Sequence, residues 1–99
     1  MDNQRTHEPT PVWHLERMGR IYDCGEDTVI YFDTRSGDTH LITLFAAFLL
    51  ESLAGRSLTL QQIEAVAAED TNPDDMEALG PAIIESLDTL VDLDIVERL

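Results

Sequence analysis

The sequence predicts an α+β domain in which a three-stranded antiparallel sheet is followed by three helices. The main observation is a change at Thr43, where the spacing of apolar residues passes from the alternation of a strand to the 3.6-residue period of a helix. Before that point, turn residues such as Gly37 and Asp38 separate the strand-like segments. The 99 residues, 43% of them apolar, are enough for one hydrophobic core and too few for two.

Three segments have the residue pattern of strands. Trp13 to Tyr22 alternates imperfectly around Gly19 and fits one strand or two short ones. Thr28 to Phe32 is the clearest strand, since all its residues are β-branched or aromatic and turns bound it on both sides. Because neither of its faces is polar, we expect both faces to be covered. Thr39 to Ile42 then returns antiparallel to it, and one strand of this meander must lie at an open edge.

The first two helices have recognisable start and stop signals. Thr43 is suited to cap the first helix, because its hydroxyl can accept a hydrogen bond from a free N–H of the first turn. Gly55 ends that helix, since glycine tolerates a positive φ. Thr59 with Gln62 has the form of a capping box and predicts a second helix that extends to about Glu69.

The third helix is the longest. Its apolar stripe consists of Met76, Leu79, Ile83, Leu87 and Leu90. Gly80 and Pro81 interrupt this pattern, so the helix either kinks there or begins at Pro81. Beyond the helix, Asp94 is expected in a left-handed turn position, and Ile95 with Val96 in a short extended segment.

The sequence divides into an arm and one domain. Residues 1–11, with Pro9 and Pro11 among polar neighbours, are expected to form a flexible N-terminal arm, and residues 12–99 a single domain. The longest apolar run, Leu44 to Leu50, is too short to span a membrane, and the first residues lack the pattern of a signal peptide. A lone cysteine excludes an internal disulfide. We therefore expect a cytoplasmic protein.

Acidic residues dominate the charge. Twenty acids face six arginines, there is no lysine, and the formal net charge is −14. Nucleic acid is a poor partner for such a chain, because binding to it depends on Lys and Arg that displace counterions. From Glu51 onward there are twelve acids and two arginines. This asymmetry fits a self-repelling, soluble surface or a surface that attracts a basic partner.

No residue pattern indicates catalysis or metal binding. The three histidines lack the spacing of a metal site, and there is neither a glycine-rich phosphate loop nor a nucleophile elbow. Asp38 beside His40 fits a structural hydrogen bond better than a catalytic pair. The acids Asp23 and Glu26 disfavour the thiolate of Cys24. We therefore expect no enzymatic activity, no cofactor and no metal.

Three strands followed by three helices and a short terminal extended segment resemble the winged helix-turn-helix plan. A DNA-binding member of that class carries basic residues at the start of its recognition helix. The corresponding positions here are Asp74, Asp75 and Glu77. The charge of these residues favours a ligand other than DNA.

A more detailed resemblance covers residues 13 to 97. The matching segments are Trp13-His14-Leu15, Val29-Ile30-Tyr31-Phe32, Ser36-Gly37-Asp38-Thr39-His40-Leu41-Ile42, Ala46-Ala47-Phe48-Leu49-Leu50, Leu60-Gln61-Gln62-Ile63 and the residues Leu87, Leu90, Leu93, Ile95 and Val96. In this ordered set the chain resembles the PqqD family, small peptide chaperones also called RiPP recognition elements, and most of all its HPr-rel-A system branch. Thr43 stands where the family usually has Asn or Asp, and Asp94 stands where it usually has Gly. Thr43 keeps an oxygen that can cap the helix, and Asp94 tolerates the left-handed turn position.

The resemblance implies a binding site between the third strand and the third helix. A peptide would add there as an extra antiparallel strand, with affinity from the backbone and specificity from apolar pockets. The residues implied for this site are Thr39, His40, Leu41, Ile42, Thr43, Ile84, Leu87, Asp88, Val91 and Asp92. Asp88 and Asp92 could pair with basic residues of the peptide. Alternatively, Ile84, Leu87 and Val91 belong to the core.

The implied function is non-catalytic. The protein would capture a leader or precursor peptide and present it to a modifying enzyme, and the branch name adds an HPr-kinase-related protein as a partner of the same system. Two alternatives stay open: a winged-helix transcriptional regulator, which the charge disfavours, and a structural module that forms a homodimer through its open strand edge. We expect neither nucleic acid nor a membrane as a partner.

Overall fold

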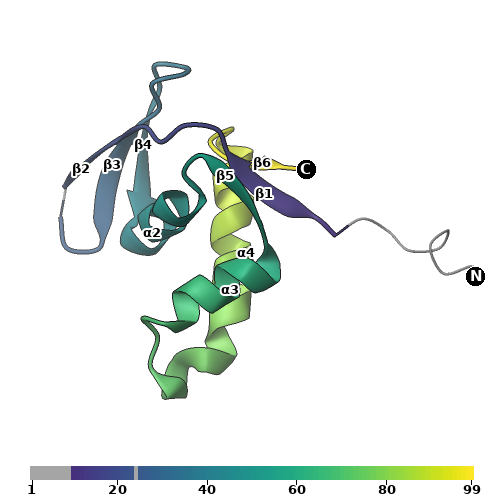
Figure 1. Ribbon diagram of the computed structural model, residues 1–99. Helices are drawn as coiled ribbons and strands as arrows, with labels where there is room; N and C mark the ends of the chain where they lie inside the picture. Colours follow the sequence, from purple (N-terminus) through teal and green to yellow (C-terminus); the bar gives the residue numbers. More distant parts are fainter. Residues whose placement is uncertain (1–9, 24) are drawn as a thin grey trace, which may run out of the picture.

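Two three-stranded antiparallel sheets and three α-helices make up the part of the chain that the computed structural model describes, residues 10–23 and 25–99 (Figure 1). In chain order the elements are β1 (Val12–Leu15), β2 (Arg20–Asp23), β3 (Thr28–Phe32), β4 (Thr39–Thr43), α2 (Leu44–Leu53), β5 (Arg56–Thr59), α3 (Leu60–Ala68), the 3₁₀ helix η1 (Pro73–Asp75), α4 (Met76–Asp92) and β6 (Glu97–Arg98). The α+β class is therefore confirmed. The expected arm lies largely outside the described residues.

The predicted order of strands first and helices afterwards is wrong. β5 lies between α2 and α3, β6 follows α4, and both pair with β1 in the sheet of order β5-β1-β6. In this pairing Val12 lies opposite Thr59, and His14 lies opposite Glu97. These pairings join segments that are far apart in the sequence, and β5 contains only one buried residue, Leu58. A four-residue segment of this kind carries no strand pattern of its own.

The segment Trp13 to Tyr22 splits into two strands that belong to different sheets. Gly19 lies in the connection, where its N–H donates to the hydroxyl of the buried Tyr31 at 2.7 Å. A Cβ at this position would clash with the carbonyl oxygen of Phe32 and would lie 2.9 Å from the Tyr31 hydroxyl. Glycine is therefore required for the close approach of this connection to β3.

The second sheet has the order β2-β3-β4 and packs one face against α2. Val29 and Tyr31 of β3 are buried on that inner face, together with Ile42 of β4. Ile30 and Phe32 point to the other face and are only partly buried. The prediction that both faces of β3 are covered is wrong for this outer face, because α2 lies on the inner one.

The predicted helix signals are confirmed. The Thr43 hydroxyl accepts from the Ala46 N–H at 3.0 Å, and Gly55 has a φ of 73° directly after the C-cap of α2. In the capping box of α3, the Gln62 N–H donates to the Thr59 hydroxyl at 3.2 Å, and the Thr59 N–H donates to the Gln62 side chain at 2.8 Å. These signals are local, and their residues bond within one turn.

α4 continues through Pro81, so the helix does not begin at that residue. The missing proline N–H would have bonded to the carbonyl of Glu77, which lies in an exposed first turn where water can reach it. Four of the stripe residues, Leu79, Ile83, Leu87 and Leu90, are buried. Met76 is an exception, with 44% of its surface exposed.

The C-terminal segment continues past α4 into the other sheet. Asp94 has a φ of 61°, which confirms the predicted left-handed position. Ile95 and Val96 are buried, and their N–H groups donate to the Leu90 carbonyl at 3.0 and 3.2 Å. The strand itself, β6, begins two residues later than expected, at Glu97.

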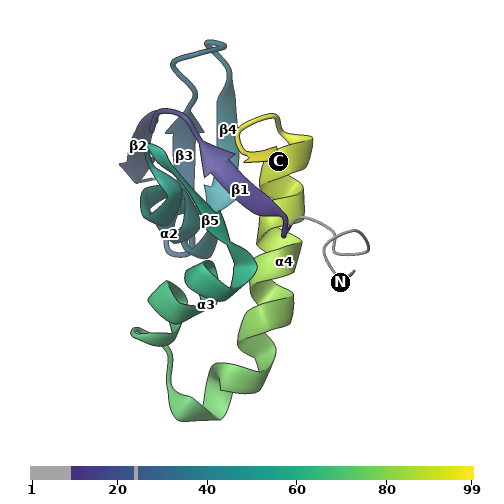
Figure 2. The same cartoon turned by 45° about the vertical axis from the view of Figure 1, so that its right-hand side comes forward.

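The core joins both sheets to all three helices. Its fully buried large side chains include Leu15, Tyr31, Leu49, Leu50, Leu53, Ile63, Ile83, Leu87, Leu90 and Ile95. Figure 2 shows α4 running past both sheets, with α3 packed beside its lower half. Within the described ranges, no helix combines the length and the hydropathy that crossing a membrane requires.

Candidate functional site

β4 lies at one edge of the β2-β3-β4 sheet (Figure 1). In the described part of the chain, no strand pairs with its other side. An edge of this kind leaves a row of backbone N–H and C=O groups without sheet partners. Which residues carry these groups follows from the pairing of β4 with β3.

Two hydrogen bonds at the ends of this pair set its alternation. Beyond one end, the Leu44 N–H donates to the Asp27 carbonyl at 3.0 Å. Beyond the other end, the Asp33 N–H donates to the Asp38 carbonyl at 2.8 Å. In an antiparallel pair, directly opposed residues alternate between bonded and non-bonded positions. Both ends give the same alternation along the whole of β4.

It follows that the two interior residues His40 and Ile42 direct their backbone groups toward β3, opposite Tyr31 and Val29. The backbone N–H groups of Thr39, Leu41 and Thr43 therefore point to the open side. The carbonyls of Thr39 and Leu41 point the same way. The open edge thus offers three donors and two acceptors in the spacing that an added strand requires.

A groove of about 370 Å³ lies along this edge, between β4, the start of α2 and α4. Its lining residues are Thr28, Leu41, Ile42, Thr43, Ala46, Glu85, Ser86, Thr89 and Leu90. Ile42, Ala46 and Leu90 are buried and form an apolar floor. Leu41 is 65% exposed at the rim, an unusual position for a large apolar side chain.

A second hollow lies at the C-terminal end of α4, beside the turn that precedes β4. It has a volume of about 270 Å³ and is lined by Asp33, Arg35, Ser36, Asp38, Leu93 and Asp94. Arg35 is the one cation among these residues, and Asp33 neutralises it through a salt bridge of 3.0 Å. The charges left at the rims of the two hollows are acidic: Glu85, Asp38 and Asp94.

Arg35 also ties the turn before β4 to the end of α4. Its guanidinium donates to both oxygens of the buried Asp33 carboxylate at 3.1 and 3.0 Å, and to the carbonyls of Asp94 and Ile95 at 2.8 and 3.2 Å. The bonds from the guanidinium hold the pKa of Asp33 below its ordinary value, and the same bonds raise the pKa of Arg35. This arrangement, called the Asp33–Arg35 clamp below, sets the position of β4 relative to α4.

Of the β4 residues in the sequence-derived site, Leu41, Ile42 and Thr43 line the groove, whereas Thr39 and His40 do not. The α4 residues of that site lie elsewhere. Leu87 is fully buried in the core, and Val91 packs partly buried against it. Ile84 and Asp88 line a different cavity, and Asp92 is exposed without lining either hollow beside β4. None of the α4 residues in the sequence-derived site therefore lines the groove beside β4.

The residues of α4 that face β4 were not singled out from the sequence. They are Glu85, Ser86, Thr89 and Leu90. Successive helix residues are rotated by about 100°, so these residues occupy one flank of the buried stripe and Ile84, Asp88 and Val91 the other. The small polar side chains Ser86 and Thr89 are the one sequence signal for this flank, because they leave room next to a buried stripe.

The cavity on the other flank is lined by Thr10, Pro11, Trp13, Thr59, Leu60, Gln61, Ile84, Asp88 and Arg98, and has a volume of about 580 Å³. The Arg98 guanidinium lies 5.7 Å from the centre of the Trp13 ring, a cation–π arrangement. The indole N–H of Trp13 is buried and has no partner among the described residues. This cavity is separated from the β4 groove by the body of α4.

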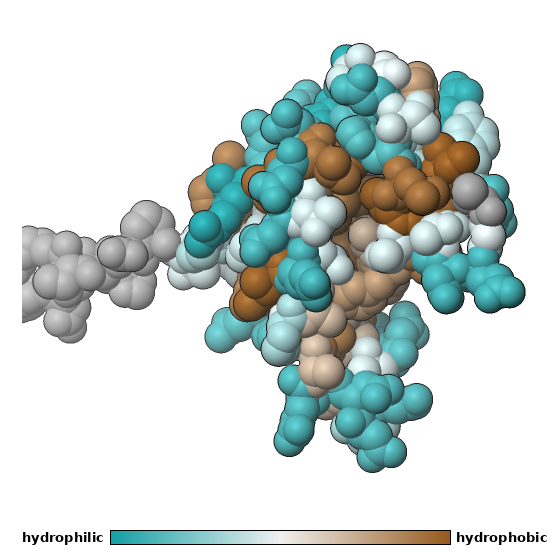
Figure 3. Space-filling view, turned by 180° about the vertical axis from the view of Figure 1, so that it is seen from behind, coloured by the Kyte–Doolittle hydropathy of each residue, from teal (hydrophilic) through white to brown (hydrophobic). Residues whose placement is uncertain are grey.

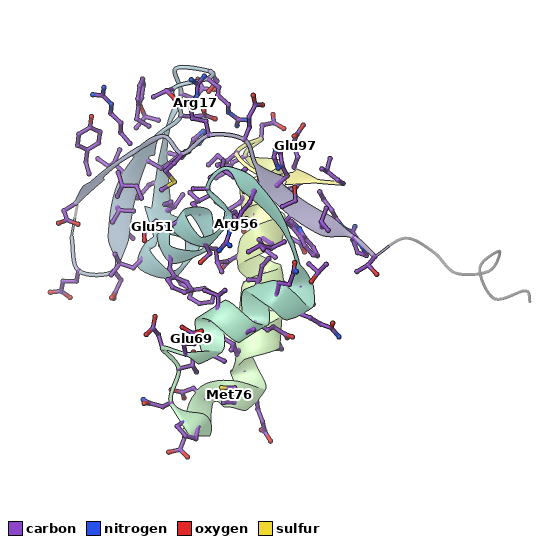
Figure 4. The ribbon with its side chains drawn as sticks, in the orientation of Figure 1. Arg17, Glu51, Arg56, Glu69, Met76 and Glu97 are labelled. Carbon is purple, nitrogen blue, oxygen red and sulfur yellow. The ribbon has the colours of Figure 1, made fainter. Side chains whose placement is uncertain are left out.

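No arginine among residues 10–23 and 25–99 lines the β4 groove. Arg56, at the start of β5, donates to the Ser52 carbonyl at 2.8 Å, and Arg17 lies in the connection between β1 and β2 (Figure 4). His14 pairs with the Ser57 hydroxyl at 2.9 Å. Cys24 and His7 lie outside the described residues. No group of three or more His, Cys, Asp and Glu side chains in the described ranges has the arrangement of a metal site.

Comparison with known proteins finds no matching protein family, no matching curated protein and no matching solved structure. The properties of the candidate site therefore come from its own residues: an open strand edge, an apolar floor and an acidic rim.

Proposed function

We propose that this protein binds an extended peptide, which adds as an antiparallel strand to β4 in the groove against α4. The observation that carries the proposal is the open edge of β4, whose outward backbone groups at Thr39, Leu41 and Thr43 lie beside a groove with a buried apolar floor. Strand addition of this kind obtains affinity from main-chain hydrogen bonds and specificity from pockets for alternate side chains.

The resemblance of the sequence to the PqqD family supports the same function. On this proposal the chain is a winged-helix-like peptide chaperone without catalytic activity. It holds a precursor peptide and presents it to a modifying enzyme, and an HPr-kinase-related protein belongs to the same system. The acidic rim of Glu85, Asp38 and Asp94 favours a peptide with basic residues, because opposite charges speed encounter and exclude acidic competitors.

The expected affinity follows from the groups at the edge. Four or five main-chain hydrogen bonds contribute about 1 kcal/mol net each. Two apolar side chains of the peptide, buried against Ile42 and Leu90, contribute about 1.5–3 kcal/mol each to the binding free energy. The entropy cost of ordering the peptide offsets part of this sum. A dissociation constant in the micromolar range, about −8 kcal/mol, is therefore expected.

The test uses peptides selected from a random library of twelve-residue sequences displayed on phage, with the full chain as the target. A selected peptide is then synthesised, and its affinity is measured for wild type, Leu41→Pro and Leu41→Thr. Proline removes the outward N–H of Leu41 and leaves the bonds between β3 and β4 intact, because those bonds come from His40 and Ile42. Leu41→Thr keeps the outward backbone N–H of residue 41 and replaces only the apolar side chain.

We expect Leu41→Pro to weaken binding at least about tenfold more than Leu41→Thr does, since the outward hydrogen bond and its neighbours are lost. Amide NMR shifts should concentrate in Thr39–Thr43 of the wild type. A folded Leu41→Pro variant that binds as tightly as Leu41→Thr would refute strand addition. A library that yields no peptide of micromolar affinity would refute the proposed function as a whole.

A symmetric homodimer is the second candidate, because the same open edge and the exposed Leu41 could pair with their counterparts in a second copy. Sedimentation equilibrium distinguishes the two candidates. A dimer of the free wild type that dissociates in Leu41→Pro would establish self-association through β4, whereas a wild-type monomer excludes it.

A further inference from the structure

Resting on the proposed peptide function, we propose that the binding groove continues beyond Thr43 along α4, where a pocket between α2 and α4 holds an apolar side chain from the N-terminal part of the peptide. The relevant pocket, here named the lower pocket, is lined by Phe45, Thr71, Asp75, Ala78, Leu79 and Ala82. Its volume is about 230 Å³.

The lower pocket is predominantly apolar and open to solvent on one side. Phe45 forms one wall, and its ring stacks on that of Phe48 with the ring centres 6.4 Å apart. Leu79, which is buried, forms the base between the small side chains Ala78 and Ala82. In Figure 3 light-brown, moderately hydrophobic residues continue from the middle of the rear face toward the lower end, where α4 begins.

The lower pocket and the β4 groove share their two walls. On α2, Phe45 lines the lower pocket, and the next residue, Ala46, lines the groove. On α4, Ala82 lines the lower pocket, and Glu85 and Ser86, one turn further on, line the groove. Because residues three and four apart share a helix face, the two hollows lie in line along α4.

The direction of a bound strand follows from how β4 lies beside α4. The Asp33–Arg35 clamp holds the turn before Thr39 at the C-terminal end of α4, through the bond from Arg35 to the Asp94 carbonyl. Thr43, at the other end of β4, lines the groove with Glu85 and Ser86 in the middle of α4. An antiparallel strand therefore has its N-terminal end at Thr43, pointing toward the lower pocket.

The distance to the lower pocket is short. From Ser86 to Ala78 is eight residues of helix, about 12 Å at 1.5 Å per residue. An extended chain covers this distance in about four residues at 3.3 Å each. The peptide thus needs about four residues beyond its five-residue pairing with Thr39–Thr43, and the residue that enters the lower pocket lies near its N-terminus.

The occupant of the lower pocket is apolar, with a basic group next to it. Ala78, Leu79 and Ala82 leave space for one aliphatic or aromatic side chain. Asp75, the N-cap residue of α4, and Glu85, within α4, carry the charges on this wall, and no arginine lines either hollow. Both acids are exposed, so a cationic side chain or the free amino terminus of the peptide can pair with either while remaining partly solvated.

The test fills the lower pocket without changing β4. Ala82→Leu adds an aliphatic side chain to a half-buried position of the pocket, whereas the matched control Ala65→Leu adds the same atoms to an exposed position of α3. The probes are a library-selected twelve-residue peptide and the same peptide shortened by four N-terminal residues. Affinities are measured by fluorescence anisotropy for wild type and both variants.

We expect Ala82→Leu to weaken binding of the full peptide about tenfold or more, because an apolar side chain loses its buried site. The shortened peptide should bind wild type and Ala82→Leu equally, and Ala65→Leu should bind both peptides like wild type. If Ala82→Leu binds the full peptide as wild type does, while Leu41→Pro still abolishes binding, the lower pocket is not a subsite and the proposed function stands. If Leu41→Pro leaves binding unchanged, strand addition fails and this inference fails with it.

Discussion

Removing the Arg35 guanidinium should destabilise the protein and change how its stability depends on pH. The side chain makes two bonds to the Asp33 carboxylate and two to backbone carbonyls at the end of α4. The Asp33 side chain is 4% exposed and the Arg35 side chain 29%. Arg35→Ala therefore leaves a buried carboxylate, which keeps only the hydrogen bond from the backbone N–H of residue 35, at 2.9 Å in the wild type. Breaking a buried pair costs about 3–5 kcal/mol and an exposed pair about 0–1 kcal/mol.

We expect an intermediate loss of about 2–3 kcal/mol for Arg35→Ala at pH 7, which corresponds to a fall in Tm of roughly 8–24 °C for a domain of this size. Urea denaturation followed by circular dichroism measures the free energy of unfolding. Arg35→Lys keeps the positive charge but loses the bidentate hydrogen bonding to the carboxylate. The loss of stability in Arg35→Lys should therefore be about half of that in Arg35→Ala.

The pH dependence gives a separate check. In the folded protein the pKa of Asp33 lies below its ordinary value of 3.8, because the Arg35 guanidinium bonds to the charged form. The clamp therefore stabilises the fold fully above the ordinary pKa, and this contribution is lost as the pH falls through the lower folded pKa. The difference in stability between wild type and Arg35→Ala should be full at pH 7 and should shrink as the pH falls below about 4.

A double-mutant cycle with Asp33→Asn isolates the pair. We expect Asp33→Asn to weaken the effect of Arg35→Ala by about 1–2 kcal/mol, since the two side chains are in direct contact. A loss below about 0.5 kcal/mol at pH 7, or a loss that is the same at pH 7 and at pH 2.5, would contradict the reasoning.

Four further substitutions test other parts of the structure. Gly19→Ala should destabilise the protein by about 1–3 kcal/mol in thermal unfolding, because its Cβ would meet the Phe32 carbonyl, and unchanged stability would contradict the close approach. Thr59→Ala should cost about 1 kcal/mol by removing the capping box of α3, and an unchanged Tm would contradict this. Glu85→Arg and Asp88→Arg change the charge equally on opposite flanks of α4. Glu85→Arg should weaken the binding of a selected basic peptide about tenfold, and Asp88→Arg less than about twofold. Equal effects of the two substitutions would place the peptide elsewhere.

Local signals in the sequence were enough to predict most element ends. Thr43, Gly55, Thr59 and Asp94 take the predicted capping or turn positions, because each acts through its own φ or through bonds within one turn. The strand Thr39–Thr43 was predicted at nearly its true length for a similar reason, as turn residues precede it and a helix cap ends it. Pro81 left two alternatives open, a kink or a helix start, and the structure excludes the start because α4 runs from Met76 through Pro81.

Contacts between distant segments could not be predicted in this way. Val12–Leu15 pairs with two segments that follow it by more than forty residues, and neither partner has a strand pattern of its own. The same limit applied to the site: the sequence indicated an open edge in the meander, but the flank of α4 that meets β4 depends on how the helix is rotated. A rotation by one residue, about 100°, exchanges Glu85 and Thr89 for Ile84 and Asp88.

The sequence by its own patterns therefore determined the class of the fold, the presence of an open strand edge and the acidic charge of the chain. Only the tertiary structure decided which side chains line the groove, through the burial of Ile83, Leu87 and Leu90 in the core and through the bonds of Arg35 to the end of α4. The physical reason is that caps, turns and alternation are set by neighbours along the chain. The rotation of a helix is set by all the apolar surface that it buries at once.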